Sequence, residues 1–273
     1  MIVNLKKKNS QIRKISVILL LIFSLCVFSF INKDEKNIQV SAEGVSNKKI
    51  GWGIKRNDNH EQPDLGKKNK ELLEKYDGIA IGNAQDKYVY LTFDEGYEAG
   101  YTEEVLKILK DNNVKATFFI TAHYLNTEPE LVKQMIDEGH IVGNHTVNHK
   151  SMPSLTDEQI NKETMDLHKM IYEKFGYEMK YLRPPMGEFC ERSLSITNSL
   201  GYKTVMWSFA YEDWNEDKQP EEHTAKQKII DNIHNGEIML LHGNSRTNTK
   251  ILDEIIKEIK NTGYEFKSLE EIQ

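Results

Sequence analysis

The chain has 273 residues, of which 38% are hydrophobic and 29% charged, so it is an ordinary globular protein long enough for one large catalytic domain. The net charge is −6, and the basic first 32 residues contribute +5, which leaves −11 on the rest. A body this acidic argues against nucleic acid as the partner, because phosphate binding needs a basic face.

The N-terminal segment predicts an exported or membrane-attached protein. A basic stretch precedes an apolar run without charge from Ile15 to Ile31. A run of this length is at the short limit for a membrane span, so residues 1–32 are either a cleaved signal peptide or a retained membrane anchor. In both cases the basic flank keeps the N-terminus in the cytoplasm and the body crosses the membrane.

Three regions follow the apolar segment. Residues 33–50 are a polar linker, residues 51–78 are expected to be an N-terminal extension packed on the domain, and residues 79–273 are the catalytic domain. Cys190 is the only cysteine after residue 32, so the exported domain has no internal disulfide and its stability comes from packing. A nucleophilic role for Cys190 is not favoured.

In the catalytic domain, short apolar runs alternate with longer amphipathic stretches. Strands are expected at 88–93, 116–120, 141–143, 181–183, 204–208, 238–241 and 265–267, and helices at 102–111, 129–138, 156–174, 191–200, 224–234 and 249–261. This alternation indicates βα units and a parallel sheet. We therefore predict an α/β fold, a distorted and incomplete (β/α) barrel of about seven parallel strands.

Polar side chains follow five of the expected strands. They are Asp94 with Glu95, His145, Arg183, the stretch from Trp207 to Trp214, and His242. Because the carboxyl ends of parallel strands share one face, where sites are built, we expect these side chains to converge.

The paired acids and histidines indicate metal-assisted hydrolysis. His145 and His149 are four residues apart and can reach one divalent ion, while Asp94 and Glu95 can supply a third ligand and a base. Neighbouring strand residues point to opposite faces, so both acids enter the site only if the chain bends before Gly96. The alternatives are a solvated acidic turn and two surface histidines.

Three further positions complete the candidate site. The guanidinium of Arg183 suits a bidentate pair that keeps a carboxylate ionised, or an ordinary buried ion pair. His242 is a general acid if a nearby acid, for which Asp213 is the candidate, shifts its pKa, and is otherwise structural. Trp207, Tyr211 and Trp214 form either an apolar wall for sugar rings or part of the core.

Together these residues resemble the polysaccharide deacetylase (NodB-like) family of carbohydrate esterases. Five motifs stand in the family's order: TFDEG (92–96), HTVNH (145–149), RPPMGE (183–188), AYEDW (210–214) and LLHGNS (240–245). The detail is similar to one branch, the delta-lactam-biosynthetic muramic acid de-N-acetylases of spore-forming bacteria. That likeness rests on GWGIKRNDNHEQPD near the N-terminus, TFDEGYEAGYT, RPPMGEFCERS and the final GYEFKSLEE.

The resemblance implies a role for each site residue. It makes Asp94 the general base, Glu95, His145 and His149 the metal ligands, Arg183 the residue that orients the base, Asp213 the residue that tunes the acid, His242 that acid, and Met186 a source of a backbone N–H for the oxyanion. The chain departs from the family at two positions. Glu95 replaces the usual aspartate, and Met186 stands where relatives often carry arginine or tyrosine, so metal binding by Glu95 and side-chain recognition by Met186 are open.

The resemblance also implies a cofactor, a substrate and a place of action. The cofactor is a divalent metal, zinc in the first instance with manganese or cobalt as alternatives. The substrate is the peptidoglycan glycan strand, from which N-acetyl groups of muramic acid are removed after a wall amidase has stripped the peptide, toward the muramic delta-lactam of spore cortex. The protein acts outside the cytoplasmic membrane, in the cell wall or cortex space.

Other functions stay open on the sequence. The chain could deacetylate another N-acetylated glycan. It could be a wall glycosidase that uses Asp94 with Asp213 or Glu188 as its two carboxylates, although the histidines would then be idle. It could also be a non-catalytic wall-binding protein on the same fold.

Overall fold

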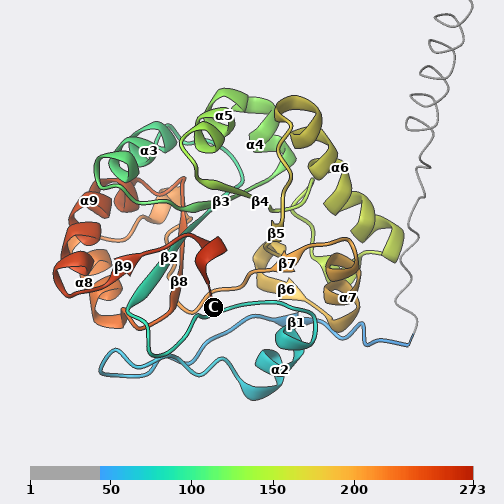
Figure 1. Cartoon of the computed structure of the whole chain (residues 1–273), viewed down its shortest axis with the longest axis horizontal. Helices are drawn as coiled ribbons and strands as arrows, with labels where there is room; N and C mark the ends of the chain where they lie inside the picture. Colours follow the sequence, from blue (N-terminus) through green and yellow to red (C-terminus); the bar gives the residue numbers. More distant parts are fainter. Residues whose placement is uncertain (1–43, 273) are drawn as a thin grey trace, which may run out of the picture. The chain divides into compact units, whose positions relative to one another are not determined.

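The computed structural model describes residues 44–272, and its central feature is a curled, seven-stranded parallel sheet (Figure 1). The strands are β2 (Tyr88–Glu95), β3 (Thr117–Ile120), β4 (Ile141–Asn144), β5 (Tyr181–Leu182), β7 (Lys203–Thr204), β8 (Glu237–His242) and β9 (Glu265–Phe266). Their order is β7-β5-β4-β3-β2-β8, with β9 beside β2. The chain after β7 returns to β8, where Phe209 and Met239 form a parallel bridge. The predicted α/β half-barrel is confirmed.

Helices cover the outside of the sheet (Figure 1). They are α3 (Thr102–Asp111), α4 (Ala122–Thr127), α5 (Pro129–Asp137), α6 (Asp157–Phe175), α7 (Glu191–Ser199), α8 (Glu222–Asn232) and α9 (Arg246–Asn261). Local capping sets their starts: at α6 the Thr156 side chain accepts from the backbone N–H of Gln159, and the Gln159 side chain accepts from that of Thr156.

The two faces of β2 pack against different cores. Val89, Leu91 and Phe93 point outward into the main core beneath the helices. Tyr90 points inward to a smaller cluster inside the curl, with Phe119 and other residues. Because side chains alternate along a strand, this pattern decides which way the two acids at the end of β2 point.

The N-terminal extension lies along one edge of this unit (Figure 1). It contains β1 (Ile50–Gly51), which pairs antiparallel with β6 (Glu188–Phe189), and helix α2 (Lys67–Lys75). Short 3-10 turns η1 (Met152–Ser154), η2 (Pro185–Gly187), η3 (Glu216–Lys218) and η4 (Leu269–Glu271) complete the elements. The expected signal peptide or anchor and most of the expected linker fall outside the described residues. Within residues 44–272, none of the helices combines the length and the apolar character that a membrane span requires.

Several predicted boundaries shift for identifiable reasons. The strand expected at 204–208 shortens to Lys203–Thr204, because the backbone N–H groups beyond it donate to separate segments instead of one neighbour. The helix expected from residue 249 begins at Arg246, since the Ser245 hydroxyl caps it by accepting from the backbone of Asn248. The sequence did not predict α2, α4 or the β1–β6 pair.

Candidate active site

A pocket of about 860 Å³ opens at the carboxyl ends of the strands. Its lining includes Asp94, Tyr97, His123, His145, Asn148, His149, Met186, Gly187, Trp207, Ala210, Trp214, His242 and Asn244. Asp94 and His242 lie at the ends of β2 and β8, and the other residues lie in the segments that follow β2, β3, β4, β5, β7 and β8. The structure thus brings together the polar residues that follow separate strands in the sequence.

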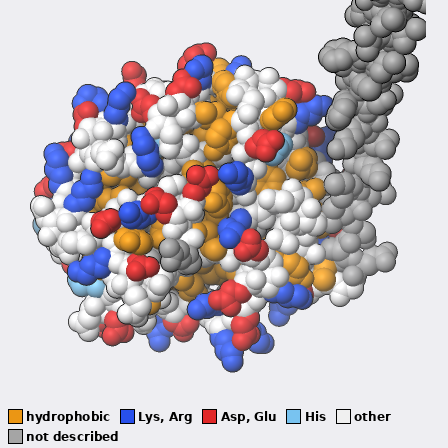
Figure 2. Space-filling view, viewed as in Figure 1, with side chains coloured by type: hydrophobic (Ala, Val, Ile, Leu, Met, Phe, Trp, Pro, Cys, Tyr) orange, Lys and Arg blue, Asp and Glu red, His pale blue; other side chains and the backbone are white. Residues whose placement is uncertain are grey.

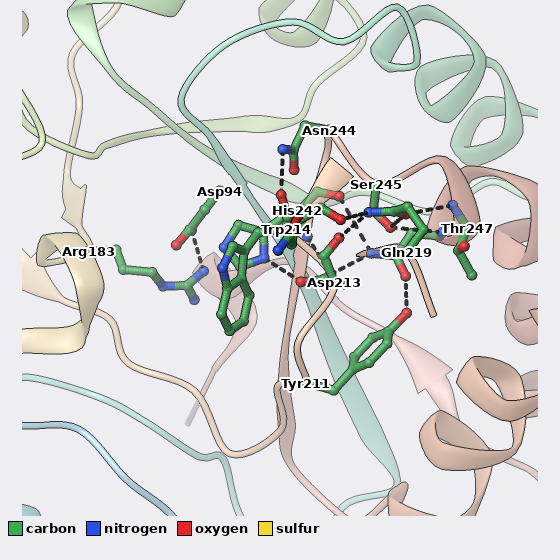
Figure 3. A network of polar contacts seen from close by, with 12 residues as sticks. Asp94, Arg183, Tyr211, Asp213, Trp214, Gln219, His242, Asn244, Ser245 and Thr247 are labelled. Atoms are coloured by element: carbon green, nitrogen blue, oxygen red, sulfur yellow. Dashed lines mark hydrogen bonds and ion pairs between the residues drawn. The ribbon is translucent and has the colours of Figure 1, made fainter. Parts of the chain in front are cut away.

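Asp94 points into this pocket and is held by Arg183. Its position on β2 shares the inward face with Tyr90. Arg183 Nη1 donates to Asp94 Oδ1 at 2.8 Å (Figure 3). Arg183 Nε and Nη2 donate to the backbone carbonyls of Val205 and Met206. The contact is therefore one hydrogen bond and not a bidentate pair. Burial alone raises the pKa of Asp94, but the charge of Arg183, helped by the histidines, holds it below the usual value.

Glu95 points the other way. It follows Phe93 on the outward face of β2, it is buried, and it does not line the pocket. Its carboxylate lies against Gly243, where a Cβ would come within 1.9 Å of Oε1, so a side chain at residue 243 would require Glu95 to move. Burial, with Glu98 and Asp94 nearby, raises its pKa well above the usual value. The chain does not bend before Gly96, and Glu95 lies apart from the histidines with which it was expected to bind metal.

His145 and His149 do converge. Their Nε2 atoms are 3.2 Å apart, and His145 Nε2 lies 3.5 Å from Asp94 Oδ2. His145 Nδ1 is 2.8 Å from the carbonyl oxygen of Arg183; since a carbonyl only accepts, Nδ1 carries the hydrogen and Nε2 presents its lone pair. Burial lowers the pKa of His145 to about 4 and also lowers that of His149, so both rings are neutral at physiological pH.

The histidine pair fits a divalent metal. Two nitrogens bound to one tetrahedral zinc ion lie about 3.3 Å apart, close to the spacing found here. The hydrogen bond from Nδ1 to a backbone carbonyl is the outer contact that fixes such a ligand. Across residues 44–272, however, no group of three or more His, Cys, Asp or Glu side chains is arranged to hold a metal. The described residues therefore offer two converging histidine nitrogens, and a third candidate ligand is not identified among them.

On the neighbouring strand β8, His242 is the register partner of Asp94 and forms a tight pair with Asp213 (Figure 3). His242 Nδ1 lies 2.7 Å from Asp213 Oδ1, and the backbone N–H of His242 donates to Oδ2 at 2.9 Å. A carboxylate only accepts, so Nδ1 carries the hydrogen and Nε2 is left for the pocket. Burial lowers the pKa of His242, but the charge of Asp213 outweighs it and the pKa rises. The imidazolium is thus favoured, as a general acid requires.

Further residues hold this pair in place, among them Tyr211, which was expected in an apolar wall or in the core and is buried. Asn248 donates to Asp213 Oδ2 at 2.6 Å and accepts from the Tyr211 hydroxyl. Gln219 donates to the backbone carbonyl of Asp213 and accepts from the hydroxyl of Ser245 (Figure 3). Tyr211 and Ser245 lie within the fourth and fifth motifs, so their places in the motifs could have indicated that they belong to the site. The sequence offered no such signal for Gln219 and Asn248.

Exposed apolar side chains surround the mouth of the pocket. Tyr97, Met186 and Trp214 are three of the four large hydrophobic residues described as exposed. Trp214 lies 5.5 Å from the ring of His242, and Asn244 joins its carbonyl to the hydroxyl of Tyr97. Trp207 is half-buried beside Gly187. These faces suit sugar rings, which present apolar C–H surfaces.

Comparisons with known proteins assign this arrangement to a family. The polysaccharide deacetylase model matches residues 81–205. The peptidoglycan-N-acetylmuramic acid deacetylase PdaA of Bacillus subtilis (strain 168) is 45% identical over 232 residues, 85% of this chain and 88% of that protein. The chain therefore belongs to the polysaccharide deacetylase family.

The fold is also similar to solved structures of family 4 carbohydrate esterases. The structure of Bacillus subtilis PdaA, a family 4 carbohydrate esterase, matches with a TM-score of 0.81 at 44% identity, covering 84% of this chain and 98% of that one. A family 4 carbohydrate esterase from Bacillus anthracis gives 0.72 at 39% identity over the same shares. A Bacillus anthracis pseudoenzyme of the family gives 0.67 at 29%, covering 71% of this chain and 68% of that one. Because the family includes a pseudoenzyme, the activity of this chain depends on its own residues.

Proposed function

We propose that the chain is a metal-dependent hydrolase that removes N-acetyl groups from muramic acid in peptidoglycan. The observation that carries the proposal is one pocket in which Asp94, held ionised by Arg183, lies beside His242, which is paired with Asp213. The likeness to an N-acetylmuramic acid deacetylase at 45% identity supports the choice of sugar.

In the proposed reaction a divalent metal, zinc in the first instance, is held by His145 and His149 and when bound supplies Lewis-acid activation of water and of the acetamide carbonyl. Asp94 accepts the proton from the attacking water. A backbone N–H at Met186 donates a hydrogen bond that stabilises the oxyanion. His242 Nε2 then donates a proton to the departing amine, and acetate leaves. Trp207 and Trp214 hold the sugar.

Asp213 is unsuited to the glycosidase mechanism. It is buried, does not line the pocket, and both of its carboxylate oxygens accept hydrogen bonds. Glu188 accepts from Lys49 and Ser151. Among the residues of 44–272 that line the pocket, Asp94 is the one carboxylate, whereas two-carboxylate glycosidases require a second.

We further propose where and when the activity takes place. The apolar N-terminal segment supports action outside the cytoplasmic membrane, in the wall or the spore cortex space, with the segment as signal or anchor. A free muramic amine can close on its own lactyl carboxylate to a delta-lactam, which requires that a wall amidase has first freed that carboxylate from the peptide. On the face in Figure 2, acidic and basic side chains are interspersed, which does not suit nucleic acid.

The test uses the full chain purified in detergent, with and without chelator. We expect chelator-sensitive acetate release from peptide-stripped peptidoglycan, and fragment masses that show an amine or a lactam. Asp94→Asn and His242→Ala should each lower the rate on the order of 100-fold or more, because each removes a proton-transfer group. Lack of acetate from folded, metal-loaded wild type, on this substrate and on chitin-type glycans, would favour the wall-binding protein instead.

A further inference from the structure

A tryptophan outside the pocket connects two segments of its wall. The backbone N–H of Trp52 donates to the carbonyl of Gly187 at 2.8 Å, and its indole Nε1 donates to the carbonyl of Trp207 at 2.9 Å. Gly187 and Trp207 both line the pocket, whereas Trp52 does not. One residue of the N-terminal extension therefore fixes the spacing between the turn after β5 and the segment after β7.

The turn that Trp52 holds is strained and closely packed. Met186 has φ 58°, in the left-handed region that costs a non-glycine residue about 1 kcal/mol. Gly187 has φ 64°, and a Cβ there would lie 2.7 Å from the ring of Trp207 and 3.2 Å from Cβ of Trp52. Strained backbone persists only where its surroundings fix it, and the Trp52 backbone contact does so next to the Met186–Gly187 peptide.

The same segment after β7 also positions the base. Arg183 donates to the carbonyls of Val205 and Met206, and its guanidinium lies 5.8 Å from the ring of Trp207. The guanidinium also lies 4.2 Å from the centre of the Phe119 ring, and it donates to Asp94. A shift of the Trp207 backbone would therefore move the residues that anchor Arg183, and with them the carboxylate.

A second contact of the extension reaches the same segment after β7, further along the chain. The guanidinium of Arg56 lies over the ring of Phe209 at 5.4 Å and donates to the carbonyl of Ala210. Ala210 lines the pocket and begins the motif that ends beside Asp213. The extension thus contacts the turn after β5 once and the segment after β7 at two places, although it precedes the residues that the family model matches.

We propose that the N-terminal extension is a working part of the active site and that Trp52 is its positioning residue. Trp52 sets the Met186–Gly187 turn against Trp207, and thereby the oxyanion N–H and the Arg183–Asp94 pair, without touching the substrate. This inference rests on the proposed deacetylase function, because its kinetic test measures that reaction.

The test compares Trp52→Phe and Trp52→Ala with Gln62→Ala in the full chain. Gln62 is a matched control, since it also joins the extension to two backbone carbonyls, those of Gly82 and Asn235, which do not line the pocket. We expect kcat to fall about tenfold in Trp52→Phe and about 100-fold in Trp52→Ala, with KM changed less than about twofold, because misplaced groups lose transition-state contacts more than substrate binding. Gln62→Ala should keep kcat.

Hydrogen exchange gives a readout that does not need turnover. In Trp52→Phe, which keeps the aromatic ring and loses the indole N–H, peptides covering 184–190 and 205–210 should exchange faster while the rest of the domain is unchanged. Normal kcat in folded Trp52→Phe and Trp52→Ala would overturn the proposal, as would faster exchange spread over the whole domain. If wild type itself releases no acetate, the proposed function fails, and the exchange pattern alone then decides whether Trp52 holds the two segments.

Discussion

At the scale of single residues, the site places two adjacent acids in opposite environments. Asp94 faces the pocket, and its pKa is held low by Arg183 against the effect of burial. Glu95 faces the outer core, where neither carboxylate oxygen has a hydrogen-bond partner among the described residues and burial raises its pKa. One acid is thus kept ionised for proton transfer, and the other favours its neutral form.

Replacing Glu95 by glutamine should stabilise the metal-free protein at neutral pH. The pKa of Glu95 is higher in the folded than in the unfolded state, so the folded state is penalised as pH rises above about 4.5, the usual value. Glutamine never ionises and removes this penalty. Urea unfolding with chelator present should therefore show that Glu95→Gln is more stable than wild type at about pH 8, with a smaller difference at about pH 5.

The variant of the adjacent acid, Asp94→Asn, should instead lower the free energy of unfolding. It removes an ionised partner of Arg183 and leaves that charge buried, so we expect a loss of about 3 kcal/mol or more.

Metal titration of Glu95→Gln tests the role as a metal ligand that the sequence suggested for Glu95. Near wild-type zinc affinity agrees with the outward position of the side chain, whereas a large loss of affinity would restore Glu95 as a ligand.

At the scale of elements, regular strand geometry explains what the sequence could and could not predict. The βα alternation and the polar residues at strand ends were sufficient for the half-barrel and for the convergence of Asp94, His145 and His242. The direction of Glu95 was open because it depends on whether β2 bends, and pairing with β3 keeps β2 regular through Glu95. The contacts of Trp52 were not predictable, since they join residues more than a hundred positions apart that share no periodic pattern.

One buried histidine between elements gives a pH prediction. His140 precedes β4, and its Nδ1 accepts from the backbone N–H of Ala116, just before β3, at 3.1 Å. Burial lowers its pKa to about 4. In the unfolded state His140 takes up a proton near its usual pKa of 6.5, whereas in the folded state it stays neutral down to about pH 4. The folded state therefore loses stability relative to the unfolded state as the pH falls from 6.5 toward about 4. The total loss is about 3 kcal/mol, at about 1.4 kcal/mol per pKa unit.

The His140→Asn variant separates this effect from other titrations. The amide oxygen of asparagine can replace Nδ1 as the acceptor for Ala116, and the side chain does not titrate. Between about pH 6.5 and pH 4.5, the free energy of unfolding should fall less steeply with pH in the variant than in wild type. The difference in slope corresponds to the uptake of up to one proton on unfolding. Parallel curves for the two proteins would show that His140 titrates alike in the folded and unfolded states.

At the scale of the whole molecule, the site depends on a domain that is stabilised by packing. Cys190 is a free, buried cysteine that caps α7, and residues 44–272 contain no other cysteine. The pocket draws its residues from strands that are far apart in the sequence, so it exists only when the sheet is assembled. A ligand of the pocket therefore binds the folded state and stabilises the whole domain by mass action.

Zinc binding should raise the melting temperature through this linkage. With zinc at one hundred times its dissociation constant, the native state gains about 2.7 kcal/mol. A domain of this size shifts by roughly 2–4 °C per kcal/mol, so differential scanning calorimetry should show a rise of roughly 5–10 °C that chelator reverses. His145→Ala and His149→Ala should each abolish the rise, because each removes one of the two converging nitrogens. His123→Ala removes a histidine that lines the same pocket and should keep it. If the melting temperature still rises with zinc in both the His145→Ala and the His149→Ala variants, zinc binds elsewhere. Its stabilising effect would then carry no information about the pocket.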